Sequence, residues 1–184
     1  KNALMNAIAA QLSSEDIANL AAHFSAQHGA AAGARPDFLP KIALANSGDL
    51  AGGVTWRWPT VARARGYFLT AMGTKDDAMV LWSSAETADA GMGLVDYLPN
   101  ATVDKWVKEK VLLPPTATSC AMPKGIFADA GQHGGGVLQM IAYGPESNLS
   151  WPPKPANPKT PWTPEWNVRV RTKSTALAML GMPV

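Results

Sequence analysis

Three cations and two indoles are the side chains in this sequence that are best suited to contact a partner. Arg169, Arg171 and Lys173 are spaced two residues apart, so a β-strand would place them on one face. Such a row can receive an anionic partner, but it usually marks the solvated face of a sandwich. Trp151 and Trp162 lie shortly before the cations, in a proline-rich stretch. Their indoles either offer a flat apolar surface to a protein or glycan, or are buried under a loop.

Side chains for catalysis or metal binding are scarce. His23 and His28 are five residues apart, whereas two histidines on one helix bind a metal best at a spacing of four. His133 lies in a glycine-rich loop. The sequence has no G-x-S-x-G motif of the kind that presents a nucleophilic serine. We therefore expect no catalytic residue and no metal site, and we favour a non-catalytic role, while enzymatic activity stays an open alternative.

Cys120 is the single cysteine of the chain, which excludes an internal disulfide and every metal site built from several cysteines. Its neighbours Ala121 and Met122 carry no charge that would lower the pKa of the thiol. We expect a small buried hydrophobe rather than a nucleophile. The eight methionines are typical of core filler, and a copper site would need several of their sulfurs at one place.

Composition and charge narrow the classes of partner. The 184 residues are 47% hydrophobic and 16% charged, and no apolar run reaches the roughly 18 residues of a membrane-spanning helix. Sixteen Lys and Arg against 14 Asp and Glu leave a net charge of +2. This charge is too small and too scattered to indicate a nucleic-acid partner. We expect a chain that does not span a membrane, and its oligomeric state stays undefined.

The elements that must position these side chains are mainly strands. Short runs rich in β-branched and aromatic residues are separated by proline, glycine or charges, which is typical of strands. They cover residues 54–58, 67–72, 79–82, 137–143 and 166–172. No helices alternate regularly with these runs, so the pattern favours an antiparallel sandwich or barrel over a parallel α/β sheet.

One helix is expected between the strands, over residues 102–111. There Val103, Trp106 and Val107 fall on a single helical stripe. Asn100 or Thr102 can cap the start of this helix with its side-chain oxygen.

The stretch 145–164, PESNLSWPPKPANPKTPWTP, contains seven prolines. Proline fixes φ and lacks an N–H donor, so we expect these residues to stay out of the sheet. They are predicted to cross the surface as an extended strap, with Trp151 and Trp162 pinned to the body of the domain.

A helical segment precedes the strands. Ile17, Leu20, Ala21 and Phe24 form one apolar face of a helix that Ser13 can cap. Residues 29–36, GAAAGARP, are small and unpatterned, which indicates a linker. The predicted organisation is a helical segment at 1–28, a linker at 29–36 and a β-sandwich domain at 37–184.

The opening residues 2–27 resemble the C-terminal portion of class I c-type cytochromes of bacterial type. The match consists of Met5 followed by LSSEDIANLAAHF, residues 12–24. The resemblance implies that Met5 is the axial thioether ligand of a haem iron. The chain has no C-x-x-C-H motif for covalent haem attachment, so we expect no cofactor in this chain, and haem c is possible only in a longer precursor. Because the chain starts at Lys1 without an initiator Met, we expect a haem-bearing half upstream; otherwise Met5 is an ordinary apolar side chain.

Residues 53–72, GVTWRWPTVARARGYFLTAM, resemble strands B and C of fibronectin type III and immunoglobulin-like sandwiches. The resemblance implies that Trp56 or Trp58 packs between the two sheets. It also implies that residues 80–82 form the next strand, that residues 137–143 form strand F, and that strand G begins at Val168. The helix and the proline-rich strap depart from the family pattern.

Together these resemblances imply a non-catalytic, exported binding or interaction module of a larger c-type cytochrome protein. Covalent haem attachment takes place outside the cytoplasm, so a periplasmic or secreted location follows from the resemblance. The alternative is a periplasmic electron-transfer component whose haem-bearing half is missing from this chain.

Overall fold

Strands dominate the computed structural model, which describes residues 38–75, 78–89, 91, 93–127 and 136–181. All of these residues belong to one compact unit of the chain, Asp37–Val184. The predicted helical segment, the predicted linker and Met5 lie outside the described residues, so they stay predictions.

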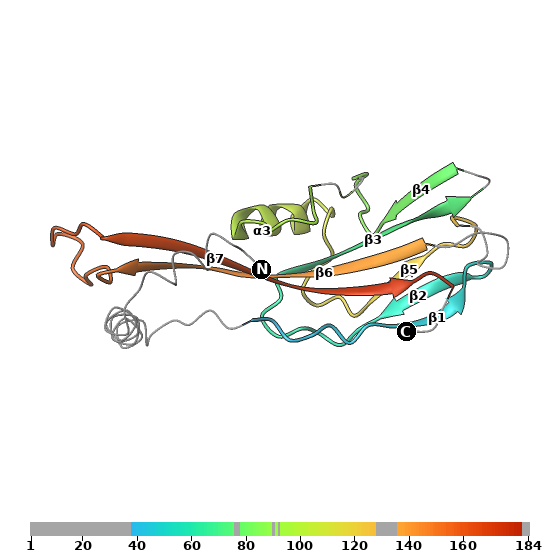
Figure 1. Cartoon of the computed structure of the whole chain (residues 1–184), viewed down its shortest axis with the longest axis horizontal. Helices are drawn as coiled ribbons and strands as arrows, with labels where there is room; N and C mark the ends of the chain where they lie inside the picture. Colours follow the sequence, from blue (N-terminus) through green and yellow to red (C-terminus); the bar gives the residue numbers. More distant parts are fainter. Residues whose placement is uncertain (1–37, 76–77, 90, 92, 128–135, 182–184) are drawn as a thin grey trace, which may run out of the picture. The chain divides into compact units, whose positions relative to one another are not determined.

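Two antiparallel sheets are built from seven strands in the described part of the chain (Figure 1). One sheet has the order β1-β2-β5 and the other the order β4-β3-β6-β7. The elements are β1 (Ala45–Asp49), β2 (Gly53–Arg57), β3 (Gly66–Lys75), β4 (Ala78–Ser83), α3 (Asn100–Lys108), β5 (Ser119–Met122), β6 (Gly136–Trp151) and β7 (Trp166–Met179). The prediction of a mainly β fold with one helix among its strands is confirmed.

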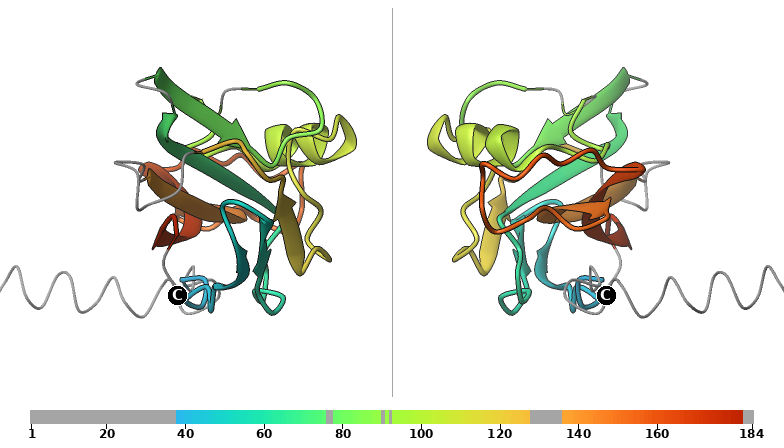
Figure 2. Two further views of the ribbon diagram at one scale, coloured as in Figure 1. Left: turned by 90° about the vertical axis from the view of Figure 1, so that its right-hand side faces the viewer. Right: turned by 90° about the vertical axis from the view of Figure 1, so that its left-hand side faces the viewer.

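The two sheets form two layers that share one core (Figure 2). In the four-stranded sheet, Leu69 pairs with Met140 and Ala71 pairs with Leu138. All four side chains are buried in the same cluster as Trp56 of the three-stranded sheet. Because side chains alternate between the faces of a strand, the odd-numbered residues of β3 meet the three-stranded sheet and the even-numbered residues point away from it.

Two tryptophans anchor this core, whereas the prediction required only one of them to be buried. Trp56 has no exposed surface and Trp58 is 3% exposed. The Trp58 ring meets Tyr67 edge to face, with 5.6 Å between the ring centroids. The Tyr67 hydroxyl oxygen accepts the backbone N–H of Val61 at 2.9 Å. The residues between β2 and β3 are therefore fixed to the core by an aromatic pair.

A second buried cluster lies on the opposite face of the four-stranded sheet, under α3. Phe68 and Ile141 are paired neighbours on β3 and β6, and they pack with Val103 of α3. Trp106 and Val107 pack against the same cluster. The predicted helix and its apolar stripe are confirmed, although α3 starts and ends earlier than residues 102–111.

The predicted side-chain cap of this helix is wrong. Pro99 occupies the cap position and no side chain caps the first turn. Proline is compatible with this place because Pro99 has extended backbone and the helix needs no N–H donor from its cap residue. The Asn100 side chain instead accepts the backbone N–H of Glu146 on its Oδ1, at 2.9 Å, so it joins the helix to β6.

The strands β1 and β5 were not predicted. Their sequences, ANSGD and SCAM, are short and mostly small or polar. Both pair with β2, where Trp56 lies opposite Asn46 on one side and Cys120 on the other. Their extended conformation follows from pairing with β2 rather than from their own β-propensity.

The β6–β7 hairpin extends beyond both layers as a two-stranded ribbon, visible at the left of Figure 1. The pairing of β3 with β6 ends at Gly66 and Tyr143, whereas the pairing of β6 with β7 continues to Trp151 and Trp166. We call residues 146–171, with their two strand segments and the loop 152–165, the arm.

The prediction that residues 145–164 stay out of the sheet is wrong for residues 146–151, which pair with β7. Pro145 lies at a bulge between Tyr143 and Glu146, where the ladder is interrupted. The other prolines of the stretch lie in the loop beyond Trp151. Bulges and loops are the places where a hairpin tolerates proline, so the residues between them can still pair. Trp151 and Trp162 accordingly belong to the arm.

The bulge depends on a glycine that is packed from two sides. A Cβ on Gly144 would lie 2.2 Å from Cδ1 of Leu39 and 2.4 Å from Oγ1 of Thr172. Both neighbours are buried, so neither can move away freely. The segment that precedes β1 therefore packs directly against the base of the arm.

We predict that Gly144→Ala lowers the free energy of unfolding by about 1–3 kcal/mol, because the added methyl overpacks this contact. Urea unfolding followed by circular dichroism measures the change. Gly93→Ala is the matched control, since a Cβ there meets no atom within 4 Å. Equal stability of the two variants would contradict the packing described here.

Cys120 lies half-buried on β5 and packs against the shared core. Burial disfavours the thiolate and raises the pKa of this thiol to about 11. The predicted small, hydrophobe-like cysteine is consistent with this environment.

We predict that iodoacetamide alkylates Cys120 at pH 8 at least about tenfold more slowly in the folded protein than in urea. The folded state favours the protonated thiol, which contributes to the stability of the fold. This contribution is complete below a pH of about 8.5, the pKa of an unfolded thiol. It is lost as the pH rises to about 11, and the alkylation rate of the folded protein should rise over the same range. A fast reaction at pH 8 under native conditions would show that the thiol is not buried.

Candidate functional site

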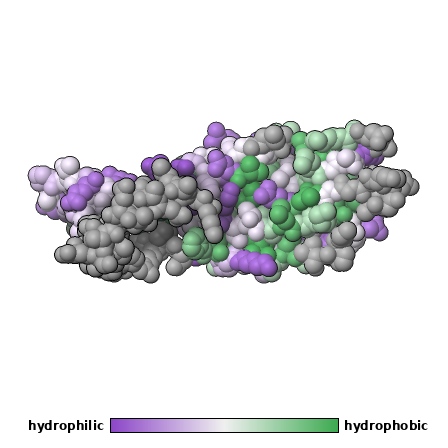
Figure 3. All heavy atoms as spheres, in the orientation of Figure 1, coloured by the Kyte–Doolittle hydropathy of each residue, from purple (hydrophilic) through white to green (hydrophobic). Residues whose placement is uncertain are grey.

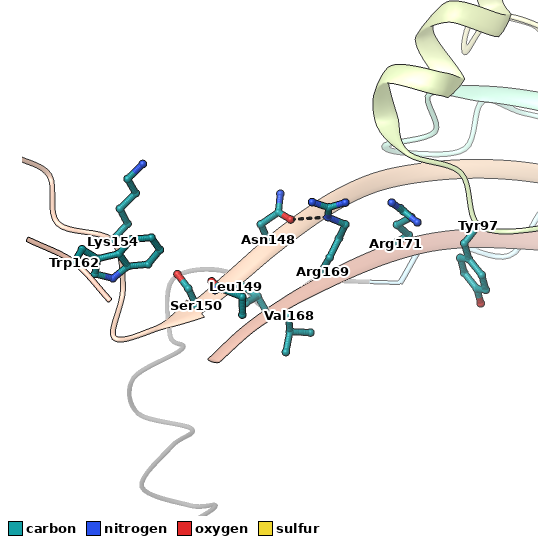
Figure 4. Close-up of a pocket in the computed structure, with 10 residues that line it drawn as sticks. Tyr97, Asn148, Leu149, Ser150, Lys154, Trp162, Val168, Arg169 and Arg171 are labelled. Carbon is teal, nitrogen blue, oxygen red and sulfur yellow. Dashed lines mark hydrogen bonds between the residues drawn. The ribbon is translucent and has the colours of Figure 1, made fainter. Parts of the chain in front are cut away.

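The arm has one polar face and one apolar face, because residues alternate along both of its strands. The cross-strand pairs of the polar face are Glu146 with Arg171, Asn148 with Arg169, and Ser150 with Asn167. The pairs of the opposite face are Ser147 with Val170, Leu149 with Val168, and Trp151 with Trp166. Figure 4 shows Asn148, Arg169 and Arg171 on one side of the ribbon, and Leu149 and Val168 on the other.

A groove of about 990 Å³ lies along the polar face of the arm. Trp162 and Lys154 from the loop line one end of the groove, and Tyr97 lines the other (Figure 4). Tyr97 comes from the segment between β4 and α3 and is 49% exposed. The groove thus has an aromatic residue at each end, with amides, a hydroxyl and guanidinium groups between them, and the apolar residues Leu149 and Val168 also border it.

Glu146 holds the two arginines in place. Its carboxylate is 15% exposed and accepts the Nε hydrogen of Arg171 at 2.7 Å. Its other oxygen lies 3.7 Å from Nε of Arg169, which also donates to Oδ1 of Asn148 at 3.1 Å. Every side-chain hydrogen bond of these arginines to a described residue uses Nε. The Nη groups are therefore left to contact a ligand.

The loop end of the groove is fixed by Trp162. Its indole N–H donates to the backbone oxygen of Pro152 at 2.9 Å. The ammonium group of Lys154 lies 5.9 Å from the centroid of the Trp162 ring. This arrangement brings an aromatic surface and a positive charge to the same end.

Three of the five predicted partner residues line the groove, namely Trp162, Arg169 and Arg171. Lys173 lies on the same face but closer to the body, where Nζ donates to the backbone oxygen of Val95 and lies 4.4 Å from the centroid of the Tyr97 ring. Trp151 lies on the apolar face, opposite Trp166. The structure therefore brings together part of the predicted surface and adds residues that sequence reasoning did not select.

The seven added lining residues are Tyr97, Asn148, Leu149, Ser150, Lys154, Asn167 and Val168. Asn148 and Ser150 alternate in the sequence as Arg169 and Arg171 do, which is a strand signal. The prolines around them outweighed that signal in the sequence prediction. The sequence around Tyr97 does not indicate that this residue lines the groove, because only the packing of its segment brings it there.

A second exposed feature is an apolar row across the four-stranded sheet. Leu81, Met72, Val137 and Met179 are successive cross-strand neighbours, and each is between 40% and 52% exposed. In Figure 3, hydrophobic residues gather on the part of the molecule that contains this sheet, whereas the arm is mainly hydrophilic. Val137 lies between Met72 and Met179 in this row.

The described residues contain neither a metal-binding cluster of side chains nor a helix suited to cross a membrane. Among them, no three His, Cys, Asp or Glu side chains come together in a way that could hold a metal ion. In the same part of the chain, no helix has both the length and the hydrophobicity that a membrane crossing requires.

The chain matches no known protein family, no curated protein and no solved structure. The resemblances to c-type cytochromes and to fibronectin type III or immunoglobulin-like sandwiches therefore stay predictions. The same holds for Met5 as a haem ligand.

We predict that Glu146→Ala loosens the arm but leaves the two-sheet body folded. An isolated two-stranded ribbon is marginally stable, and a hydrogen bond between charged groups contributes about 1.5–3 kcal/mol. Hydrogen exchange followed by mass spectrometry should show about tenfold or greater loss of protection at residues 147–151 and 166–170, with β3 unchanged.

Glu165→Ala is the matched control, because Glu165 is an exposed carboxylate of the same arm whose side chain makes no hydrogen bond or ion pair with a described residue. If both variants exchange alike, the carboxylate of Glu146 does not hold the arm together.

Proposed function

We propose that this chain is a non-catalytic, exported binding module of a larger c-type cytochrome protein and that the arm holds its partner. The observation that carries this proposal is the groove itself. Its two guanidinium groups are fixed through Nε and leave their Nη groups toward open space. Donors held in this way lose little freedom when a ligand binds, which favours affinity.

The strand order supports a sandwich of immunoglobulin or fibronectin type III character. Such sandwiches place strands C, F and G in one sheet and strands A, B and E in the other. We take β2 and β3 as strands B and C. Then β1, β2 and β5 occupy the places of strands A, B and E, and β3, β6 and β7 occupy those of strands C, F and G. The arm is then an elongated hairpin between strands F and G.

The position of the arm supports a binding role. In such sandwiches the B–C and F–G loops lie at one end, and connecting loops on a rigid scaffold commonly carry binding residues. Here the B–C connection contacts the base of the arm, because the Arg65 N–H donates to the backbone oxygen of Tyr143 at 2.8 Å.

The charges of the groove favour an anionic partner. Lys154, Arg169 and Arg171 line it, and Glu146 is the one carboxylate that contacts these arginines in the described part of the chain. A guanidinium whose Nε is already used can still bind a carboxylate or a sulfate end-on through its two Nη atoms. An acidic protein segment and an acidic glycan both meet this requirement.

The cellular context rests on the resemblance of residues 2–27 to c-type cytochromes. That resemblance supports a periplasmic or secreted location and a haem c in a longer precursor. It equally supports the alternative, a periplasmic electron-transfer component whose haem-bearing half is missing from this chain. The intact mass and the absorption spectrum of the native protein separate the two, because a haem-bearing protein absorbs strongly in the visible range.

We predict that arrays of acidic peptides and acidic glycans contain a ligand whose binding falls about tenfold or more in Arg169→Gln, since a charge-assisted contact is lost. Titration calorimetry on the selected ligand measures the change in Kd. Arg57→Gln is the control, because Arg57 is an exposed arginine on β2 of the other sheet. A best ligand that binds both variants equally would place binding outside the groove.

A further inference from the structure

The floor of the groove is a paired ribbon whose polar side chains face the ligand space, and Leu149 and Val168 of the opposite face also border that space. Residues 146–151 of β6 and 166–171 of β7 pair with each other along the whole arm. The backbone N–H and C=O groups that point from one strand toward the other are hydrogen-bonded within the ribbon. A peptide that adds to a sheet binds along an edge, where main-chain groups are unpaired. A ligand that lies on the face of this ribbon is therefore recognised mainly by side chains.

Those side chains suit a ligand rich in hydroxyl groups. Asn148, Ser150 and Asn167 line the centre of the groove. Amides and hydroxyls both donate and accept hydrogen bonds, as sugar hydroxyls do. Asn148 uses Oδ1 for Arg169, which leaves its NH₂ group as a donor. Ser150 and Asn167 make no side-chain hydrogen bond with a described residue.

The rings at the two ends suit the flat, C–H-rich faces of sugar rings. Trp162 is partly exposed and Tyr97 is 49% exposed. The face of an aromatic ring is electron-rich and attracts the weakly positive hydrogens of C–H groups. Lys154 lies against Trp162 and Lys173 lies against Tyr97, so each ring is accompanied by a cation.

The cations between the rings require acidic groups on the ligand. Arg169 and Arg171 are two residues apart on β7, which separates their Cα atoms by about 7 Å. Glu146 cancels one of these two charges, and Lys154 adds another. The groove volume of about 990 Å³ lies at the upper end of the range for small-ligand sites, about 300–1,000 Å³. A short chain of sugars therefore fits the space better than a single sugar.

We propose that the partner held by the arm is an acidic oligosaccharide. Arg169 and Arg171 bind its carboxylate or sulfate groups, and its sugar rings lie along the polar face between Trp162 and Tyr97. This inference rests on the proposed function and names the class of ligand for the same groove.

Titration calorimetry with four defined probes tests the inference on the full chain. The probes are a hexamer of galacturonic acid, which carries carboxylates; a sulfated dextran hexamer, which carries sulfates; a neutral cellohexaose; and a hexamer of glutamate. At least one acidic sugar should bind, and cellohexaose and the glutamate hexamer should each bind about tenfold or more weakly than it. The two acidic sugars identify which anionic group is preferred.

Variants connect the binding to the groove. Arg169→Gln and Trp162→Ala should each weaken the acidic sugar about tenfold, and Trp162→Tyr should restore most of the loss because it keeps a ring. Arg57→Gln should bind like the wild type. Circular dichroism verifies that each variant is folded, and Arg169→Gln alone suffices should Trp162→Ala disturb the loop.

Three outcomes overturn the inference. Binding of the glutamate hexamer through Arg169, without binding of the sugars, rejects the sugar but leaves the proposed function standing. A second outcome is that an acidic sugar binds equally well to Arg169→Gln, Trp162→Ala and Arg57→Gln. Such binding would be charge attraction without a site, and it would reject the groove as the binding site. Binding of none of the four probes, together with empty peptide and glycan arrays, rejects the inference and the proposed function together.

Discussion

The hydrogen-bonded ladder between β6 and β7 is the interaction on which both the core and the groove depend. In the body it places Met140 beside Ala176 inside the shared core, and in the arm it places Asn148 opposite Arg169. At the bulge, two residues of β6, Gly144 and Pro145, lie opposite a single residue of β7, Thr172. Side chains of β7 therefore keep their alternation through the junction. The face of the four-stranded sheet that carries α3 therefore continues along the arm as the floor of the groove. The opposite face, which packs on the three-stranded sheet, continues as the apolar face of the arm.

Glu146 combines two effects of opposite sign. It cancels one of the positive charges that would attract an acid, which lowers the long-range attraction. It also fixes Arg171 at 2.7 Å and lies 3.7 Å from Nε of Arg169. An arginine on an exposed ribbon would otherwise lose considerable side-chain entropy on binding. At physiological salt, exposed charges attract each other only over about 8 Å, so close contacts matter more than the net charge. The arrangement therefore favours geometric selectivity over general attraction.

The sequence allowed the body of the protein to be predicted better than the arm. β2, β3, β4 and α3 have strong local patterns, and the burial of Trp56 on β2 and of Trp58 just after it follows from their alternation in such a segment. β1 and β5 have no pattern of their own, because partners on β2 decide their conformation. The arm was misjudged because proline was taken to forbid pairing throughout 145–164, whereas the prolines fall at the bulge and in the loop. The cations were found by their spacing of two, but Tyr97 enters the groove from a distant segment that no spacing reveals.

The groove floor is separated from the parts that fold the domain. Asn148, Ser150, Asn167 and Arg169 belong to neither buried cluster, so their identities have little influence on the packing of the body. Mutation can therefore redesign what the arm recognises while the scaffold stays intact. The same separation makes the hairpin tip a natural place for loop grafting, in which new recognition sequences replace residues 152–165 and the sheets below serve as an unchanged frame.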